Sequence, residues 1–167
     1  PPSRPVPDFP GQWSLFSSHS ALRGRPYIPF SFQCFPLKVK PLTKKWLGQA
    51  NYDLKTAEAM LKTRRYLYVA FMCQQAIEKC FKAFMAFKGI DIIPIHNLRR
   101  LAEISGMASA FSKEDFKKMD FLSQYYLNAR YKEDIEELSS QITDVIVKDF
   151  LNFSKEKVQW LILKMRP

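Results

Sequence analysis

Apolar residues recur every three or four positions from about residue 44 onward, and this spacing predicts helices through the rest of the chain. A first helix is predicted over 44–62, with Thr43 as its N-cap. Its repeating apolar positions are Leu47, Ala50, Leu54, Ala57 and Leu61. The basic segment 62–65 is a short turn, so a second helix, 66–88, is expected to return antiparallel to the first. Gly89 is placed to end it.

A loop is predicted after the second helix, because Pro94 interrupts the helical pattern there. A short helix then follows, with His96 or Asn97 as its N-cap and with Gly106 just beyond its end. Its apolar positions are Leu98, Leu101 and Ile104.

Two more long helices complete the pattern. The first begins at 112–115, where the sequence Ser-Lys-Glu-Asp resembles a capping box, and runs to about Ala129. A charged break is expected over 130–137, and Ser139 or Ser140 is expected to cap the last helix. No segment has the two-residue period of a strand. The fold class is therefore predicted as all-α, an up-and-down bundle of four long helices and one short helix.

The predicted helix 66–88 has an unusual polarity, because it is apolar almost all the way round. Such a helix is expected at the centre of a bundle or at a subunit interface. Its polar residues are spaced three and four apart and share one face: Gln75, Glu78, Lys79 and Lys82. The simpler interpretation is a solvated edge on which Glu78 and Lys82 form an i,i+4 ion pair. The alternative is that this face is a binding site.

The first 42 residues differ from the rest in composition. Nine of the eleven prolines lie before residue 42, and no periodic pattern is sustained there. We therefore divide the chain into an irregular N-terminal extension rich in proline and aromatic residues, 1–42, and a helical bundle, 43–167. The extension could pack on the bundle, act as a binding arm, or be foreign to the native protein. We interpret it as an appendage without chemistry.

Charge and cysteine content limit the partners, the cellular compartment and the metal chemistry that the sequence predicts. The net charge is +10, which favours anionic partners such as nucleotides or RNA. The chain has neither an apolar run of membrane-spanning length nor the apolar core of a signal peptide, so a cytoplasmic protein is expected. The three cysteines (Cys34, Cys73 and Cys80) have no metal-binding spacing, and we expect them to be reduced and buried. Neither a metal nor a cofactor is expected.

Candidate chemistry is limited to a few residues. His96 is one; its simpler role is to cap a helix or hydrogen-bond the loop backbone. The other candidate is Arg130, which has Tyr126 and Tyr131 as neighbours at the end of the predicted helix that begins at 112–115 or just after it. An arginine among tyrosines can hold a phosphate while the rings stack on a base. The simpler role is to anchor the helix end. His96 and Arg130 are the weak candidates for catalysis.

Taken together, four groups of residues resemble the HEPN domain (higher eukaryotes and prokaryotes nucleotide-binding) over about residues 44–164. They are Trp46-Leu47-x-x-Ala50-x-x-Asp53-Leu54-x-x-Ala57, Gln74-Gln75-Ala76-x-Glu78-Lys79-x-x-Lys82-Ala83, His96-Asn97-Leu98-x-x-Leu101 and Tyr126-x-x-x-Arg130-Tyr131. The resemblance implies an all-α bundle that commonly forms a homodimer. It also implies pairing with a small nucleotidyltransferase, often as a toxin–antitoxin module.

Many HEPN proteins are metal-independent ribonucleases, marked by an arginine, four to six intervening residues and a histidine. Here the positions where that histidine would fall are Ile135, Glu136 and Glu137. The sequence is closer to a branch with an Arg-Tyr-Pro motif, although Lys132 stands where proline would be. We therefore expect the chain not to be an enzyme of the usual HEPN type.

Three hypotheses follow from this resemblance. The first is a nucleotide- or RNA-binding interaction module, in which Arg130, Tyr131 and Tyr126 contact the ligand. Further residues of its site would be Lys79, Lys82, Gln75 and Glu78. The second is a ribonuclease with a non-standard site built from His96 and Arg130. The third is a purely structural accessory subunit.

Overall fold

The computed structural model of the protein describes residues 40–131 and 142–166. They belong to the compact unit Cys34–Pro167. The helices are α1 (Pro41–Lys62), α2 (Tyr66–Lys88), α3 (Leu98–Ile104), a 3₁₀ turn (Ala108–Ala110), α4 (Lys113–Tyr131) and α6 (Asp144–Leu163). No strand occurs in these two ranges. The predicted all-α fold, with four long helices and one short helix, is confirmed.

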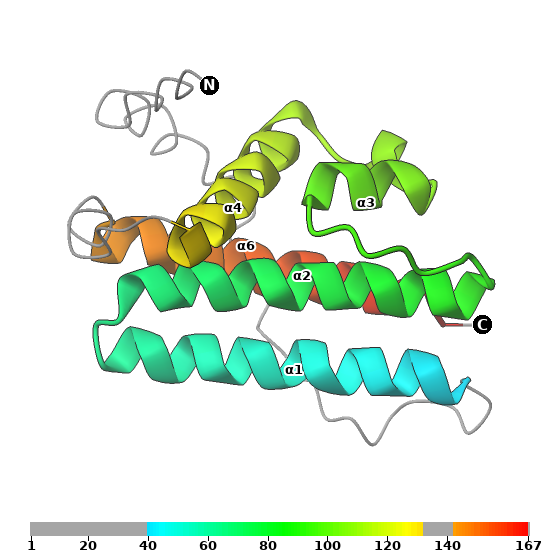
Figure 1. Cartoon of the computed structure of the whole chain (residues 1–167), viewed down its shortest axis with the longest axis horizontal. Coiled ribbons are helices and arrows are strands. Elements are labelled where there is room, and N and C mark those ends of the chain that lie inside the picture. Colours follow the sequence, from blue (N-terminus) through cyan, green and yellow to red (C-terminus); the bar gives the residue numbers. More distant parts are fainter. Residues whose placement is uncertain (1–39, 132–141, 167) are drawn as a thin grey trace. The chain divides into compact units, whose positions relative to one another are not determined.

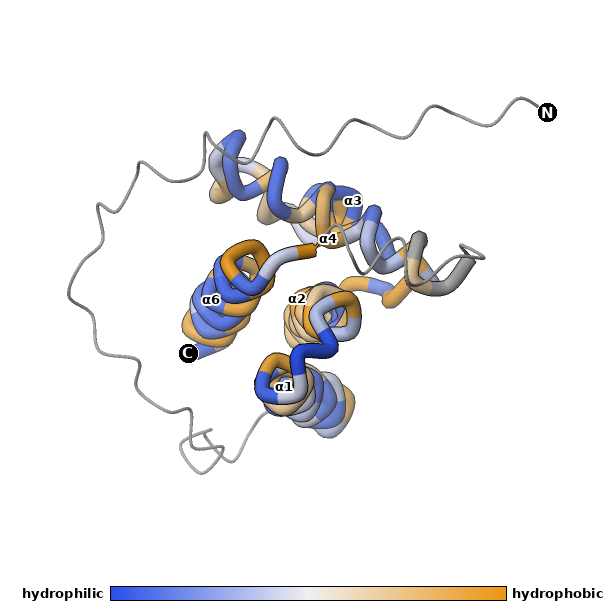
Figure 2. The backbone as a smooth tube through the Cα atoms, turned by 90° about the vertical axis from the view of Figure 1, so that its left-hand side faces the viewer, coloured by the Kyte–Doolittle hydropathy of each residue, from blue (hydrophilic) through white to orange (hydrophobic). Residues whose placement is uncertain are grey.

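Helix α2 lies at the centre of the bundle. It packs against α1, α6, α4 and α3, and Figure 2 shows it with these helices around it. Figure 1 shows α1 antiparallel to α2 and α6 running in the same direction as α2. This position explains why α2 is apolar on nearly all sides. Even so, no helix in the described ranges, α2 included, combines the length and apolar character that crossing a bilayer would need.

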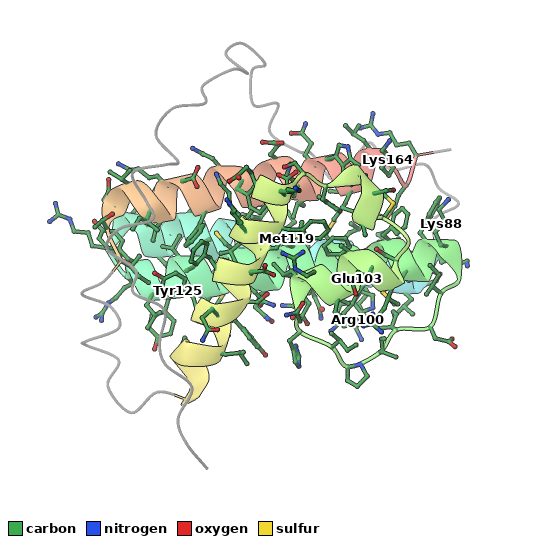
Figure 3. The ribbon with its side chains drawn as sticks, turned by 90° about the horizontal axis from the view of Figure 1, so that it is seen from above. Lys88, Arg100, Glu103, Met119, Tyr125 and Lys164 are labelled. Carbon is green, nitrogen blue, oxygen red and sulfur yellow. The ribbon has the colours of Figure 1, made fainter. Side chains whose placement is uncertain are left out.

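Helix α4 lies obliquely across α2 (Figure 3). Met119 and Leu122 are fully buried on it. One turn further along, the ring of Tyr125 packs edge-on against Phe150 of α6, with 5.9 Å between centroids. Burial raises the pKa of Tyr125 to about 12. The middle of α4 therefore packs on the core, and its last turns lead towards His96.

Several predicted helix ends are confirmed. Gly89 follows α2 with a left-handed φ of 74°, which favours glycine. Gly106 has a similar φ of 72° just after α3. Of the two candidate caps for α3, Asn97 is the one that acts, since its Oδ1 accepts a hydrogen bond of 2.9 Å from the backbone N–H of Arg100.

Two predicted N-caps are wrong. Helix α1 begins at Pro41, two residues before Thr43, because proline at a first helical position loses no hydrogen bond. The hydroxyl-bearing side chain of Thr43 is instead fully buried. Helix α6 is capped by Thr143, whose Oγ1 accepts from the N–H of Ile146 at 3.4 Å. The expected caps, Ser139 and Ser140, lie outside the described residues.

The capping box at the start of α4 is confirmed. Ser112 Oγ accepts from the N–H of Asp115 at 3.1 Å, and Asp115 Oδ2 accepts from the N–H of Ser112 at 2.9 Å. Lys157 of α6 lies 2.8 Å from the other carboxylate oxygen. Partial burial raises the pKa of Asp115, but the bonds and charge from Lys157 and Ser112 outweigh it. The pKa therefore lies below its usual value.

This lowered pKa makes the contribution of Asp115 depend on pH. A carboxyl group whose pKa is lower in the folded state stabilises that state above its unfolded pKa, and the contribution is lost as pH falls through the folded pKa. We expect Asp115→Asn to lower the free energy of unfolding by about 1 kcal/mol at pH 7. Urea unfolding at pH 7 and pH 3 should show the difference shrinking at the lower pH. An equal difference at both values would contradict the assignment.

Two cysteines are described, and both are buried on α2 without forming a disulfide. Burial raises the pKa of Cys73 to about 12 and also raises the pKa of Cys80. Because the thiolate is the nucleophile, thiols whose pKa is raised by burial are poor nucleophiles. They act as small apolar core residues, as expected from the sequence, while Cys34 lies outside the described residues.

Candidate functional site

The loop after α2 brings His96 back to the middle of that helix. Figure 1 shows the chain reversing beyond α2 and returning over it before α3 begins. As a result, His96 Nδ1 lies 3.1 Å from both carboxylate oxygens of Glu78. The carboxylate side chain is only 4% exposed, whereas the imidazole is 48% exposed. A buried charge thus holds a surface histidine.

Glu78 is the centre of a buried polar network. Lys82 Nζ donates to its Oε1 at 2.7 Å, and Gln74 Nε2 donates to its Oε2 at 3.0 Å. Gln74 Nε2 also lies 2.7 Å from the carbonyl oxygen of His96, and Gln75 Nε2 donates to Gln74 Oε1 at 2.8 Å. These bonds satisfy a carboxylate that would otherwise be costly to bury.

The expected solvated edge on α2 is therefore wrong. The Glu78–Lys82 i,i+4 ion pair exists, but both side chains are less than 10% exposed. The reason is the central position of α2: Lys82 contacts Trp46 of α1 and Glu78 contacts His96 of the returning loop, while Gln75 and Lys79 are partly exposed.

The two lysines of this face are held within the fold. Lys79 forms an ion pair with Asp53 of α1, and Lys82 lies over the ring of Trp46, 5.5 Å from its centroid. Burial raises the pKa of Asp53, although the hydrogen bond and charge of Lys79 oppose that rise. Both cations thus already have internal partners.

Tyr126 joins α4 to this site. Its ring lies 5.3 Å from that of His96 and 5.3 Å from that of Phe71, with which it stacks. Arg130 follows Tyr126 by one helical turn, so its backbone lies about 6 Å further along α4. The side chains of Arg130 and Tyr131 lie outside the described residues. The structure thus brings His96, Tyr126, Glu78 and their partners together.

The arrangement suits proton or phosphate chemistry at His96. The pairing with Glu78 places a proton on Nδ1 and fixes the orientation of the ring. The other ring nitrogen, Nε2, has no hydrogen bond to any described residue, and the side chain as a whole is 48% exposed. A neutral Nε2 can accept a proton from a hydroxyl group, and a protonated one can donate to a phosphate oxygen. Within the described ranges, no group of three or more His, Cys, Asp or Glu side chains could hold a metal ion.

Three residues of this site were quoted in the HEPN resemblance but were given no role from the sequence. Gln74 links Glu78 to the loop backbone, Asp53 pairs with Lys79, and Trp46 faces Lys82. The available signal was Gln74 itself, a polar residue in an otherwise apolar helix, lying four positions before Glu78.

Comparison with known proteins agrees with this architecture. The family model for the HEPN domain matches residues 43–165. A crystal structure of TT1696 from Thermus thermophilus is similar, with a TM-score of 0.64 and 20% sequence identity, covering 73% of this chain and 97% of that one. A crystal structure of ST0689, an archaeal HEPN homologue, gives a TM-score of 0.59 and 20% identity, with 74% and 98% covered. No curated protein sequence matches the chain.

Proposed function

The chain belongs to the HEPN domain family, and from that premise we propose that it binds a nucleotide or an RNA phosphate at the surface of His96, Tyr126 and the end of α4. In this proposal Arg130 contacts the phosphate and Tyr131 lies beside the base, while Tyr126, which is only 3% exposed, supports the ring of His96 from beneath. Gln75, Glu78, Lys79 and Lys82 act from below the surface. These four residues do not touch the ligand; they hold the contact residues in position.

The observation that carries the proposal is the support given to His96. A carboxylate that is almost fully buried, with three other polar partners, holds one half-exposed imidazole against a tyrosine ring. A loop histidine with only a structural role does not require such an environment. Preorganised polar groups of this kind are typical of binding and catalytic sites.

Interaction with other proteins forms the second part of the proposal. We propose that the domain forms a homodimer in the cytoplasm and pairs with a small nucleotidyltransferase as part of a toxin–antitoxin module. The support for this part is the family itself and the net charge of +10, which suits a partner that carries or modifies a polyanion.

Replacement of Arg130 tests the phosphate contact. Removing a charge-assisted hydrogen bond costs about 1.5–3 kcal/mol, so Arg130→Ala should weaken binding about tenfold or more. Fluorescence-detected titration with labelled ATP and a labelled 12-nucleotide RNA measures this. Arg100→Ala is the matched control, because Arg100 is exposed on α3 and pairs with Glu103 of its own helix. Equal affinity of wild type and Arg130→Ala would favour the accessory-subunit hypothesis.

A metal-independent ribonuclease is the second candidate function. The observation in its favour is the Glu78–His96 pair, since a carboxylate on Nδ1 is the usual support for a histidine that acts as a general base. Incubating structured RNA with the protein and a chelator tests it. Cleavage that both His96→Gln and Arg130→Ala abolish would establish this activity, and intact RNA with retained binding would favour the binding module.

A further inference from the structure

The outer face of α1 is strongly basic. Lys44, Lys45, Lys55 and Lys62 are all exposed on this helix, and Arg64 and Arg65 extend the face into the following turn. We call these six residues the α1 basic face. From Lys44 to Lys62 the helix rises about 27 Å, roughly the length of eight phosphates of a stacked strand. Figure 2 shows α1 at one edge of the bundle, with the other helices to one side of it.

The positive charge of this face is not neutralised within the fold. Helix α1 has two acidic residues, and both are engaged by lysines of other helices: Asp53 by Lys79 and Glu58 by Lys155. None of the six basic residues forms an ion pair with any residue in the described ranges. The whole face therefore presents uncompensated charge.

Tyr52 lies in the middle of the α1 basic face. Its side chain is 72% exposed, one of the two largest exposures among the large apolar residues described. It is seven positions after Lys45 and three before Lys55, so all three share one side of the helix. A tyrosine ring in this setting offers a flat surface on which a base can stack.

The turn after α1 adds a second indication. Arg64 has a left-handed φ of 57°, where glycine or asparagine is favoured, and this conformation costs other residues about 1 kcal/mol. Arg65 is the N-cap of α2 but makes no side-chain capping bond, and a cation is unfavourable at that end of a helix. Two arginines thus occupy positions where the backbone favours other residues.

We propose that the α1 basic face and Tyr52 bind single-stranded nucleic acid. The lysines and arginines follow the phosphate backbone, and Tyr52 stacks on one base. This surface is separate from the His96 site, which lies between α2, α4 and the loop, and it binds a strand whether or not that site holds a nucleotide. An anionic membrane suits the face less well, because Leu42 and Tyr52 are the only large apolar side chains exposed on α1.

The test compares two triple variants of the full chain by fluorescence anisotropy with a labelled 12-nucleotide oligouridine. Lys45→Ala/Lys55→Ala/Lys62→Ala removes charge from the face. Lys113→Ala/Lys164→Ala/Arg166→Ala removes the same charge from exposed positions elsewhere. Each phosphate contact with a single strand adds about 0.7 to the slope of log affinity against log salt. The first variant should therefore bind at least about tenfold more weakly in 50 mM KCl and lose about 2 from that slope, while the second stays near wild type.

Single variants and a mononucleotide complete the test. Tyr52→Ala should bind the oligouridine about tenfold more weakly, and Tyr52→Phe should bind as the wild type does. Labelled ATP, which is too short to follow the face, should bind the first triple variant as it binds wild type. The proposal is overturned if wild type does not bind the RNA in 50 mM KCl, or if both triple variants lose affinity equally. It is also overturned if the first triple variant loses ATP and RNA together, or if the face prefers vesicles of anionic lipid to RNA. Failure of ATP binding in the wild type would count against the His96 site alone.

Discussion

Replacing Glu78 with alanine should lower the free energy of unfolding by about 3–5 kcal/mol. The carboxylate is 4% exposed, and its removal leaves the ammonium group of Lys82, 7% exposed, without its ion-pair partner. It also leaves Gln74 and His96 without the acceptor that both now contact. A buried charge that loses its partner costs far more than a surface pair, which contributes about 0–1 kcal/mol.

Denaturant unfolding of three variants measures this effect. Glu103→Ala removes an exposed carboxylate that pairs with Arg100, and we expect it to change stability by less than about 0.5 kcal/mol. In Glu78→Leu/Lys82→Met both charges are absent, so much of the lost stability should return. If Glu78→Ala were as mild as Glu103→Ala, the network could not be buried as described.

Phe81→Ala should have an effect of similar size, a loss of about 3–5 kcal/mol. Phe81 is 0% exposed at the centre of α2, and its ring packs edge-on against Phe111 with 5.8 Å between centroids. Alanine would leave a cavity that the surrounding helices cannot close, because α2 contacts them on several sides. The thermal unfolding midpoint, followed by circular dichroism, measures the loss.

The matched control for Phe81 is Phe87, almost two turns further along the same helix. Phe87 is only half-buried, and it lies beside Lys88 near the end of α2. We expect Phe87→Ala to cost clearly less, since its site borders solvent, which can fill the space. An unchanged midpoint for Phe81→Ala would refute the central position of α2.

The sequence allowed most of the fold to be predicted, because its signals are local. The apolar period of α1, the left-handed glycine at Gly89 and the reciprocal bonds of Ser112 with Asp115 each depend on residues a few positions apart. The errors also have a local cause. At the start of α1, Thr43 was predicted as the N-cap from its residue type alone. The helix begins at Pro41 instead, and Thr43 is fully buried, which is a tertiary property.

The site was less predictable, because its connections are long-range. The polar stripe of α2 could be recognised, but its burial depends on α1 and on the returning loop. Nothing in the spacing between Glu78 and His96 indicates that an 18-residue separation closes to 3.1 Å. The pairing of Lys79 with Asp53 was unpredictable for the same reason, since it depends on the register in which α1 packs on α2.

The hydrogen bond from Gln74 to the carbonyl oxygen of His96 has a consequence for cooperativity. It ties the surface loop directly to the helix that every other helix of the described bundle contacts. If His96 moved away from α2, its bonds to Gln74 and Glu78 would break. Local opening of the loop is therefore coupled to opening of α2. A ligand that steadies His96 would therefore slow amide hydrogen exchange throughout α2, and a molecule bound at the surface would protect the whole bundle against unfolding.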